Sequence, residues 1–228
     1  MIGSKLAMAA MLMAMHVTAA GAQSFRPVPG RLELDAGIVW MGGHPLGTRD
    51  ATLTTGTGST LRLFSSTSDL LASAGFEGRI AVKVTPTFDA HASMSYAKPQ
   101  LTTRLTNDTE NSTGATASES VRQYLVGGGI LWYVAPRRSG PRIRPFIEAG
   151  AAYLRQLHEG ATLVATGQSY DVGCGVKVFF AARMGPRPRV KATGVRLDAH
   201  AIVRTKGITF DGRRSIAPAA AASLFVRF

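Results

Sequence analysis

The segment Ser223-Leu224-Phe225-Val226-Arg227-Phe228 places apolar side chains at every second position counted back from Phe228. Leu224, Val226 and Phe228 therefore share one face of an extended chain, and the residues between them share the other face. An apolar face that alternates with a mixed, partly polar face is typical of a strand with lipid on one side. We therefore predict that this segment is a membrane-spanning β-strand.

The same alternation occurs in seven further segments of the chain. In each of them, apolar side chains on one face alternate with small, polar or charged side chains on the other, which is the period of a half-exposed strand. The segments span residues 31–40, 79–85, 88–96, 124–134, 146–157, 171–180 and 195–204. With a final strand from about residue 219 to 228, they predict an all-β fold, an eight-stranded antiparallel up-and-down transmembrane β-barrel.

The connections between these segments differ in length and composition. The shorter or Pro/Gly-punctuated links are residues 85–86, 135–142 and 184–194, and the others are residues 42–75, 98–120, 158–169 and 207–214. Membrane barrels have short periplasmic turns and longer external loops, so we expect both termini to be periplasmic. We expect residues 107–120 to be an exposed loop. For residues 42–75 two alternatives stay open, the largest external loop or an outward extension of the first two strands.

Residues 1–22 have the organisation of a cleavable secretory signal peptide. Lys5 precedes an apolar run from Leu6 to Ala20, and Ala20-Gly21-Ala22 supplies the small-x-small cleavage pattern. A membrane-spanning helix needs about 20 apolar residues, more than this run provides. We therefore expect Sec-type export and a mature barrel domain over residues 23–228, with a retained N-terminal anchor as the alternative.

The composition gives a single cysteine, Cys174, and a formal net charge of +12. One cysteine excludes an internal disulfide framework. The basic residues form neither an amphipathic helix nor a nucleic-acid-binding motif, so we expect no nucleic-acid partner. We expect outer-membrane lipids and the phosphates of lipopolysaccharide instead. The basic turns at residues 137–144 and 187–191 are expected on the periplasmic side, where they either attract anionic head groups or add solubility.

The eight alternating segments, the signal peptide, the Gly127-Gly128-Gly129 strand interior and the terminal Phe228 resemble the small outer-membrane barrels of the OmpA and OmpX kind. The resemblance implies a monomer in the outer membrane of a Gram-negative-type bacterium. It also implies assembly by the barrel-assembly machinery, which would read Leu224, Val226 and Phe228 as its signal. A peptidoglycan-binding domain, as in two-domain OmpA, is not expected, because the sequence has no room for one.

The inner faces of the expected strands carry nearly matched acidic and basic side chains. Eight strands leave an interior that side chains can fill, and buried charges persist only when they are paired. We therefore expect a lumen locked by ion pairs. The expected network consists of Glu33, Asp35, Arg79, Lys83, Asp89, His91, Glu148, Asp171, Lys177, Arg196, Asp198, His200, Arg204 and Arg227.

These patterns favour a structural or surface-interaction protein with a plugged polar lumen that acts through its external loops, whose ligand the sequence does not define. The first alternative is a narrow ion or small-solute channel. The second is a lipid-modifying enzyme, because His91 and Ser93 resemble the His-x-Ser pair of outer-membrane lipid A deacylases. That pair would lie on the lumen face, away from lipid, so we expect no enzymatic activity. The sequence shows no metal-ligand spacing, and we expect neither a metal site nor a cofactor.

Overall fold

The computed structural model describes residues 30–106, 114–134, 142–158, 164–182, 189–205 and 215–228. Within these residues the chain forms twelve β-strands, and no helix there is long and apolar enough to cross a membrane. The expected signal peptide, residues 1–22, lies outside the described part. So do most of the basic turn at 137–144 and residues 187–188 of the second basic turn.

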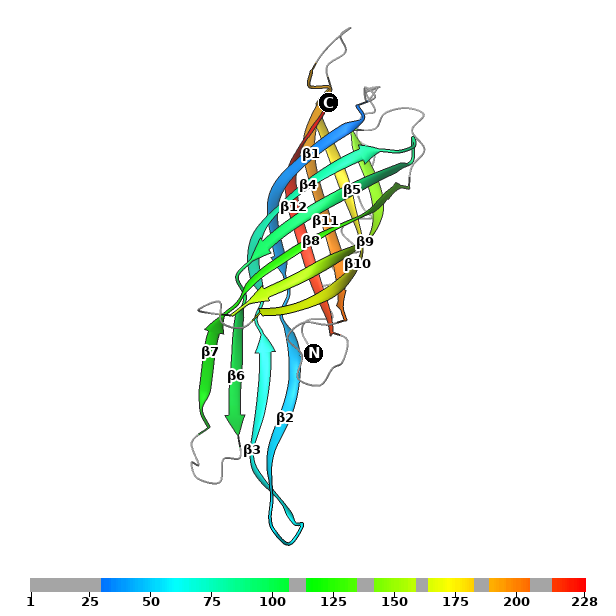
Figure 1. Ribbon diagram of the computed structural model, residues 1–228. Helices are drawn as coiled ribbons and strands as arrows, with labels where there is room; N and C mark the ends of the chain where they lie inside the picture. The colour runs from blue at the N-terminus through cyan, green and yellow to red at the C-terminus, as the bar shows by residue number, and fades with distance from the viewer. Residues whose placement is uncertain (1–29, 107–113, 135–141, 159–163, 183–188, 206–214) are drawn as a thin grey trace.

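Eight of the strands close into a single antiparallel barrel, as the sequence predicts (Figure 1). Their order around the barrel is β1-β12-β11-β10-β9-β8-β5-β4, so the first strand pairs with the last. The barrel strands are β1 (Leu32–Met41), β4 (Ser73–Lys83), β5 (Phe88–Ala97), β8 (Arg122–Tyr133), β9 (Ile143–Leu157), β10 (Val164–Ala182), β11 (Ala192–Arg204) and β12 (Ser215–Arg227). Each of the eight alternating segments of the sequence falls on one of them.

The remaining four strands form a second sheet that projects from one end of the barrel (Figure 1). These strands are β2 (His44–Thr54), β3 (Thr60–Leu70), β6 (Gln100–Thr106) and β7 (Thr116–Ser120), in the order β2-β3-β6-β7. We call them the extension sheet. A cluster of buried apolar side chains stands where this sheet meets the barrel; it consists of Leu46, Leu70, Leu101 and Val121.

The extension sheet settles one open alternative and corrects one expectation. Between residues 42 and 75 the chain forms the two strands β2 and β3 and not an irregular loop, but these strands belong to a separate sheet instead of prolonging the barrel wall, and residues 73–75 lie in the barrel strand β4. The expectation that residues 107–120 form an exposed loop is wrong for β7, which pairs with β6 from Gln100–Ser120 to Arg104–Thr116. Outside the membrane a strand needs no apolar face, so its polar side chains gave no alternating signal.

The two faces of each barrel strand differ in exposure as the alternation predicts. Ile38, Ile80 and Ile130 are more than half exposed on the outer face, whereas Lys177 and Arg196 on the inner face are fully buried. Outward aromatic side chains lie near both borders of this surface. Phe88 and Trp132 stack at the end that carries the β4–β5 turn, and Tyr96 packs against Tyr124 at the end next to the extension sheet. Such aromatic girdles mark the two membrane interfaces of barrels.

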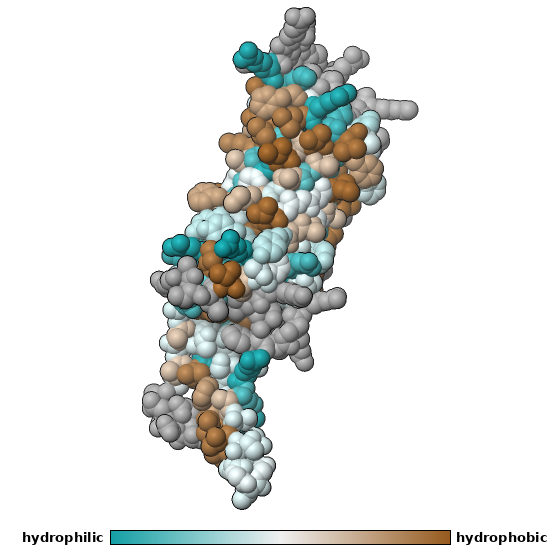
Figure 2. Space-filling view, viewed as in Figure 1, coloured by the Kyte–Doolittle hydropathy of each residue, from teal (hydrophilic) through white to brown (hydrophobic). Residues whose placement is uncertain are grey.

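Figure 2 shows the same division on the surface, with brown hydrophobic side chains over the barrel and paler ones over much of the extension sheet. Cys174 is exposed on the outer face of β10, as expected for a lipid-facing side chain. The β4–β5 turn is short and hydrogen-bonded, because the Thr85 hydroxyl accepts the backbone N–H groups of Thr87 and Phe88. We call this end of the barrel the turn side and the opposite end the sheet side.

Candidate functional site in the barrel lumen

The lumen holds two clusters of charged side chains, and the first lies on the turn side. Glu33 of β1 accepts hydrogen bonds from Arg227 of β12, with Nε at 2.9 Å from Oε2, and from the Lys177 ammonium of β10. Tyr133 donates its hydroxyl to Asp89 at 2.6 Å, and Arg227 lies 3.6 Å from the same carboxylate. All five side chains are buried, so the cluster ties together strands that are distant in sequence.

Aromatic rings close the lumen around this turn-side cluster. Phe179 and Phe225 meet edge to face with centroids 5.0 Å apart. Arg144 lies between rings, 5.5 Å from the centroid of Tyr133 and 5.6 Å from that of Phe179. The sequence analysis assigned Arg144 to a basic periplasmic turn, and this placement corrects it. Arg144 occupies an inward-facing position of β9, where the aromatic rings attract its guanidinium group.

The second cluster, which we call the central cluster, is organised by two arginines. Arg79 of β4 donates to Glu148 of β9, with Nη1 at 2.8 Å from Oε1, and also to Glu77. Its Nη2 lies 3.5 Å from Asp198 of β11. Arg196 donates to Asp198 at 2.7 Å and to Glu148, so that both guanidinium groups share the same two carboxylates.

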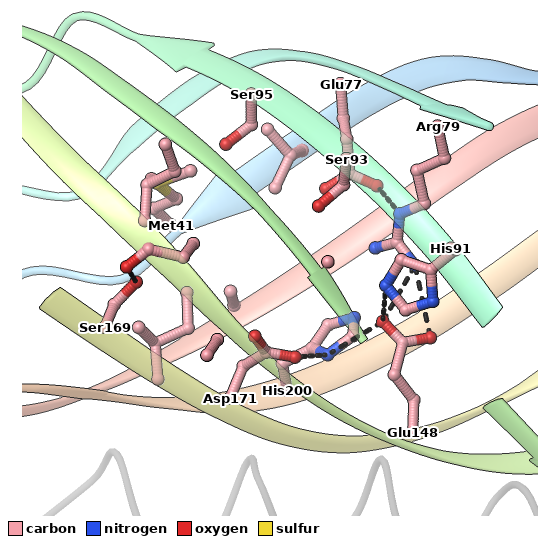
Figure 3. A pocket seen from close by; sticks show the side chains of 17 residues that line it. Met41, Glu77, Arg79, His91, Ser93, Ser95, Glu148, Ser169, Asp171 and His200 are labelled. Atoms are coloured by element: carbon pink, nitrogen blue, oxygen red, sulfur yellow. Dashed lines mark hydrogen bonds and ion pairs between the residues drawn. The ribbon is translucent and has the colours of Figure 1, made fainter. Parts of the chain in front are cut away.

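Beside these arginines, two histidines and two carboxylates face one another across a small space (Figure 3). The His200 Nδ1 lies 3.7 Å from Asp171 Oδ2 and 3.9 Å from Glu148 Oε1. The His91 Nε2 lies 3.8 Å from the same Glu148 oxygen. The His200 Nε2 is hydrogen-bonded to Asp198, whereas the buried Nδ1 has no hydrogen-bond partner.

Glycines on the inner face leave the room that these side chains occupy. A Cβ at Gly173 would lie 2.5 Å from His200 Nδ1, and one at Gly150 would lie 2.8 Å from Asp171 Oδ1. Gly173 is also the register partner of both Glu148 and His200. A larger residue at either position would displace the group from its present geometry.

A cavity of about 60 Å³ extends from this group toward the sheet side. Its lining includes all four side chains of the group and the hydroxyls of Ser93, Ser95 and Ser169. One water needs roughly 10–15 Å³ of such space and two to four polar partners, so the cavity can hold several ordered waters.

Between the cavity and the extension sheet, a layer of packed side chains fills the lumen. Met41 and Leu125 belong to a buried apolar cluster with Leu154. Gln156 donates to Gln123 at 3.1 Å, and Gln123 donates to the Met41 sulfur at 3.1 Å. This layer lies at the sheet-side end of the cavity, whose lining includes Met41 and Leu125.

The structure places the expected network residues on the inner face, but it does not bring all of them into one network. Twelve of the fourteen take part in the two clusters or the histidine–carboxylate group. Lys83 is half-buried near the turn-side end of β4. Arg204 stands apart at the sheet side, where it donates to His44 Nε2 at 3.3 Å and forms no ion pair with a described carboxylate.

The expected assembly-signal residues share the outer face of β12 and its end. Leu224 is strongly exposed there, and Val226 and Phe228 are half-buried. His91 and Ser93, the pair that resembles a deacylase motif, both line the internal cavity and not the lipid-facing surface.

Sequence reasoning missed several lumen residues. Glu77 precedes the expected start of its strand at residue 79, although it has the same parity as Arg79 and could have been found by extending the alternation. Tyr133, Gln123 and Gln156 carry no charge at neutral pH, so a lumen network expected from matched charges did not include them. The convergence of Glu148, Asp171 and His200 gave no local signal, because the three residues lie on three different strands.

Comparison with known proteins gives structural similarity only. No protein-family model and no curated protein matches the chain. The crystal structure of Neisserial surface protein A is similar with a TM-score of 0.46 and 13% identity, covering 86% of this chain and 97% of that one. The outer membrane protein OprG from Pseudomonas aeruginosa gives a TM-score of 0.45 and 8% identity, covering 87% and 96%. Ail of Yersinia pestis, in complex with the heparin analogue sucrose octasulfate, gives 0.38 and 11%, covering 87% and 99%.

The strands themselves define the class. A closed eight-stranded antiparallel barrel with an apolar exterior, aromatic side chains near both borders and a polar interior is a transmembrane β-barrel of the outer-membrane type. The predicted likeness to small eight-stranded outer-membrane barrels is thus confirmed at the level of fold. The class agrees with the expected location, the outer membrane of a Gram-negative-type bacterium.

Proposed function

We propose that this barrel is a closed, monomeric scaffold that holds the extension sheet at the cell surface, where the sheet binds partners. The observation that carries the proposal is the extension sheet itself. Its four strands stand outside the barrel and are joined to it through the apolar cluster Leu46, Leu70, Leu101 and Val121. A folded sheet holds its side chains in fixed positions and so presents a preorganised binding surface.

The composition of the extension sheet fits a role in binding. Hydroxyl pairs cross its strands: Thr48 with Thr67 at 3.1 Å, and Ser68 with Thr103 at 2.9 Å. Its outer strands, β2 and β7, each have one edge without a neighbouring strand in the described sheet. Leu53 and Leu61 near the tip are more than half exposed. Free edges and exposed apolar side chains are features that partner proteins recognise.

The filled lumen supports the scaffold role over the channel alternative. Aromatic rings at the turn side, shared ion pairs in the centre and the Met41–Gln123–Gln156 layer leave an internal cavity of about 60 Å³. A conducting path would need a continuous water column along the axis, which a side-chain-filled eight-stranded barrel does not provide.

Lipopolysaccharide is the membrane partner that we propose for the rim of the barrel. Three exposed basic side chains lie at the sheet-side rim, each two residues from a tyrosine and closer than it to the extension sheet. The pairs are Lys98 with Tyr96, Arg122 with Tyr124, and Arg155 with Tyr153. The strands are neighbours, since Tyr124 pairs with Tyr96 on one side and with Arg155 on the other. Cations at this level match the phosphates of an anionic outer leaflet.

The test of the scaffold role compares the intact protein with a variant in which residues 43–71 are replaced by a two-residue turn. Mass spectrometry of material that copurifies from the native outer membrane should show surface partners with the intact protein and lose them with the variant. Planar-bilayer recordings of the intact protein should show no stable conductance. Stable ion-selective openings would replace this proposal with the channel alternative. Identical partners for both proteins would exclude β2 and β3 as the binding surface.

The lipopolysaccharide contact has its own matched test. The charge reversals Lys98→Glu, Arg122→Glu and Arg155→Glu, combined, should markedly reduce the lipopolysaccharide retained per purified barrel. The control reverses three exposed arginines of the extension sheet, Arg49, Arg62 and Arg104, which changes the net charge equally. Equal loss in both variants would show a net-charge effect and would count against a rim site.

A further inference from the structure

We propose that Glu148, Asp171 and His200 form a binding site for one divalent transition-metal ion inside the lumen. Their candidate ligand atoms all lie within 4.8 Å of one another, and they come from the three neighbouring strands β9, β10 and β11. A small shift of these side chains would place all three atoms about 2.0–2.2 Å from one ion between them, which is the distance at which imidazole and carboxylate ligands hold zinc. The site would link three barrel strands from within.

The hydrogen bonding of His200 prepares it for this role. Its Nε2 is bound to Asp198, which fixes the proton on that nitrogen when the imidazole is neutral. The lone pair is then on Nδ1, which is buried, has no hydrogen-bond partner and faces the Asp171 and Glu148 oxygens at 3.7 and 3.9 Å. A histidine that donates one N–H to a carboxylate while its other nitrogen faces further ligands is the usual arrangement around protein-bound zinc.

The side chain of His200 is only 7% exposed, so water from outside does not satisfy its nitrogen. A lone pair directed at two carboxylate oxygens is electrostatically unfavourable unless a positive charge, or a donor such as a cavity water, lies between them. Either a metal ion or a second proton on the imidazole can supply that charge. The experiment below separates a bound metal ion from the other cases.

The charge balance of the surrounding side chains favours a cation. Four carboxylates, those of Asp35, Glu77, Glu148 and Asp198, form ion pairs with only two guanidinium groups, those of Arg79 and Arg196, and a fifth carboxylate, Asp171, faces His200. Buried charges that are not compensated destabilise a protein strongly. A divalent ion would remove most of this excess negative charge.

The inner-face glycines provide the space for an ion. Gly173 and Gly150 stand directly beside His200 and Asp171, and a Cβ at either position would intrude on the ligand atoms at 2.5 and 2.8 Å. The adjoining cavity of about 60 Å³ has room for water as a further ligand. His91, whose Nε2 lies 3.8 Å from the same Glu148 oxygen, is placed to orient that carboxylate or to join the ligand set.

The ligand types indicate the class of metal. One or two imidazoles with two carboxylates suit zinc and similar first-row ions, whereas calcium and magnesium prefer oxygen ligands alone. Zn²⁺ is therefore the probe. Refolding in the presence of Zn²⁺ gives the ion access to the site before the lumen is filled by side chains.

The experiment uses the mature protein without a histidine tag, refolded into detergent micelles with Zn²⁺ and then desalted. Elemental mass spectrometry should find about one zinc per chain in the wild type. His200→Gln and Asp171→Asn should each lower the retained zinc at least tenfold. His158→Gln, which makes the same change at a histidine outside the barrel strands, should retain it fully. Zinc should also raise the thermal unfolding temperature of the wild type but not that of the two site variants.

Two results would overturn the proposal. The first is a wild type that retains no more zinc than Asp171→Asn, in which case a second proton on His200 or a cavity water satisfies the group. The second is full retention by Asp171→Asn, which would place any zinc elsewhere. Asp171→Asn keeps the test decisive even if His200→Gln fails to fold, because among the described residues Asp171 forms an ion pair with His200 alone.

Discussion

At the scale of single residues, the charged side chains expected to contribute most to stability are those that pair with more than one partner. Glu33 neutralises both Lys177 and Arg227, which lie 144 and 194 residues away in sequence. The three side chains are almost completely buried. Removal of the shared carboxylate would leave two cations without their main counter-charge, and a stranded buried charge costs more than the intact pair contributes.

We therefore expect Glu33→Ala to lower the free energy of unfolding by about 3–5 kcal/mol. Asp50→Ala is the matched control, because Asp50 pairs with Arg62 on the exposed part of the extension sheet and should cost no more than about 1 kcal/mol. Urea unfolding in detergent micelles, followed by tryptophan fluorescence, measures both. A small effect of Glu33→Ala would mean that water in the lumen solvates the two cations.

His44 gives a pH dependence to the junction between barrel and extension sheet. Burial and the neighbouring Arg204 guanidinium lower the pKa of His44 from 6.5 to about 4. Between these values the unfolded segment binds a proton that the folded one does not, so its stability is complete above about pH 6.5 and falls as the pH decreases toward 4. The protection factors of the β2 amides, which correct the exchange rates for the pH dependence of intrinsic exchange, should therefore fall as the pH decreases over this range, whereas His44→Gln should flatten the profile. An equally steep profile in His44→Gln would assign the effect to other groups.

At the scale of elements, each barrel strand presents one face to lipid and the other to the lumen. This division follows from the two-residue period of a strand and explains why fully buried Lys177 and strongly exposed Phe180 can belong to one element. The extension strands obey a different condition. Water solvates both faces there, so hydroxyl side chains occupy positions that would be apolar within the membrane.

The lipid face can be tested at Ile80, which is exposed on the outer face of β4. Ile80→Arg should destabilise the barrel by about 2–4 kcal/mol if position 80 lies near the bilayer midplane. Thr52→Arg, on the exposed part of β2, is the control and should be close to neutral. Unfolding in lipid vesicles gives both values. A harmless Ile80→Arg would indicate that β4 faces the lumen at this position.

At the scale of the whole molecule, the barrel closes without help from the extension sheet. β1 pairs with β4 up to Met41 and Ser73, immediately before the chain enters β2 and after it leaves β3. The pairing of β1 with β12 likewise involves barrel residues only. The barrel ladder is therefore complete once the chain between Met41 and Ser73 is bridged.

Replacement of residues 43–71 by a short turn should thus leave a folded barrel with the heat-modifiable gel migration of the wild type. The β6–β7 hairpin should become sensitive to protease in the same variant, because β6 loses its partner β3. Limited proteolysis with mass spectrometry measures this local effect. Loss of heat-modifiable migration would show that the extension sheet is needed for the barrel itself.

The sequence by itself determined the eight barrel strands and which of their side chains face inward. This was possible because strand alternation is local: a two-residue period is legible in any segment with lipid on one side. The extension strands β6 and β7 carried no such contrast, so their pairing emerged only in three dimensions.

The choice of partners within the lumen was decided only by the tertiary structure. Whether Glu148 meets Arg79, Arg196 or His200 depends on the tilt and stagger with which eight strands close, and no segment encodes that stagger alone. The same closure brings Glu148, Asp171 and His200 together from three strands and leaves a cavity beside them. A single strand determines which of its side chains face the lumen, whereas a binding site in the lumen forms only in the closed barrel.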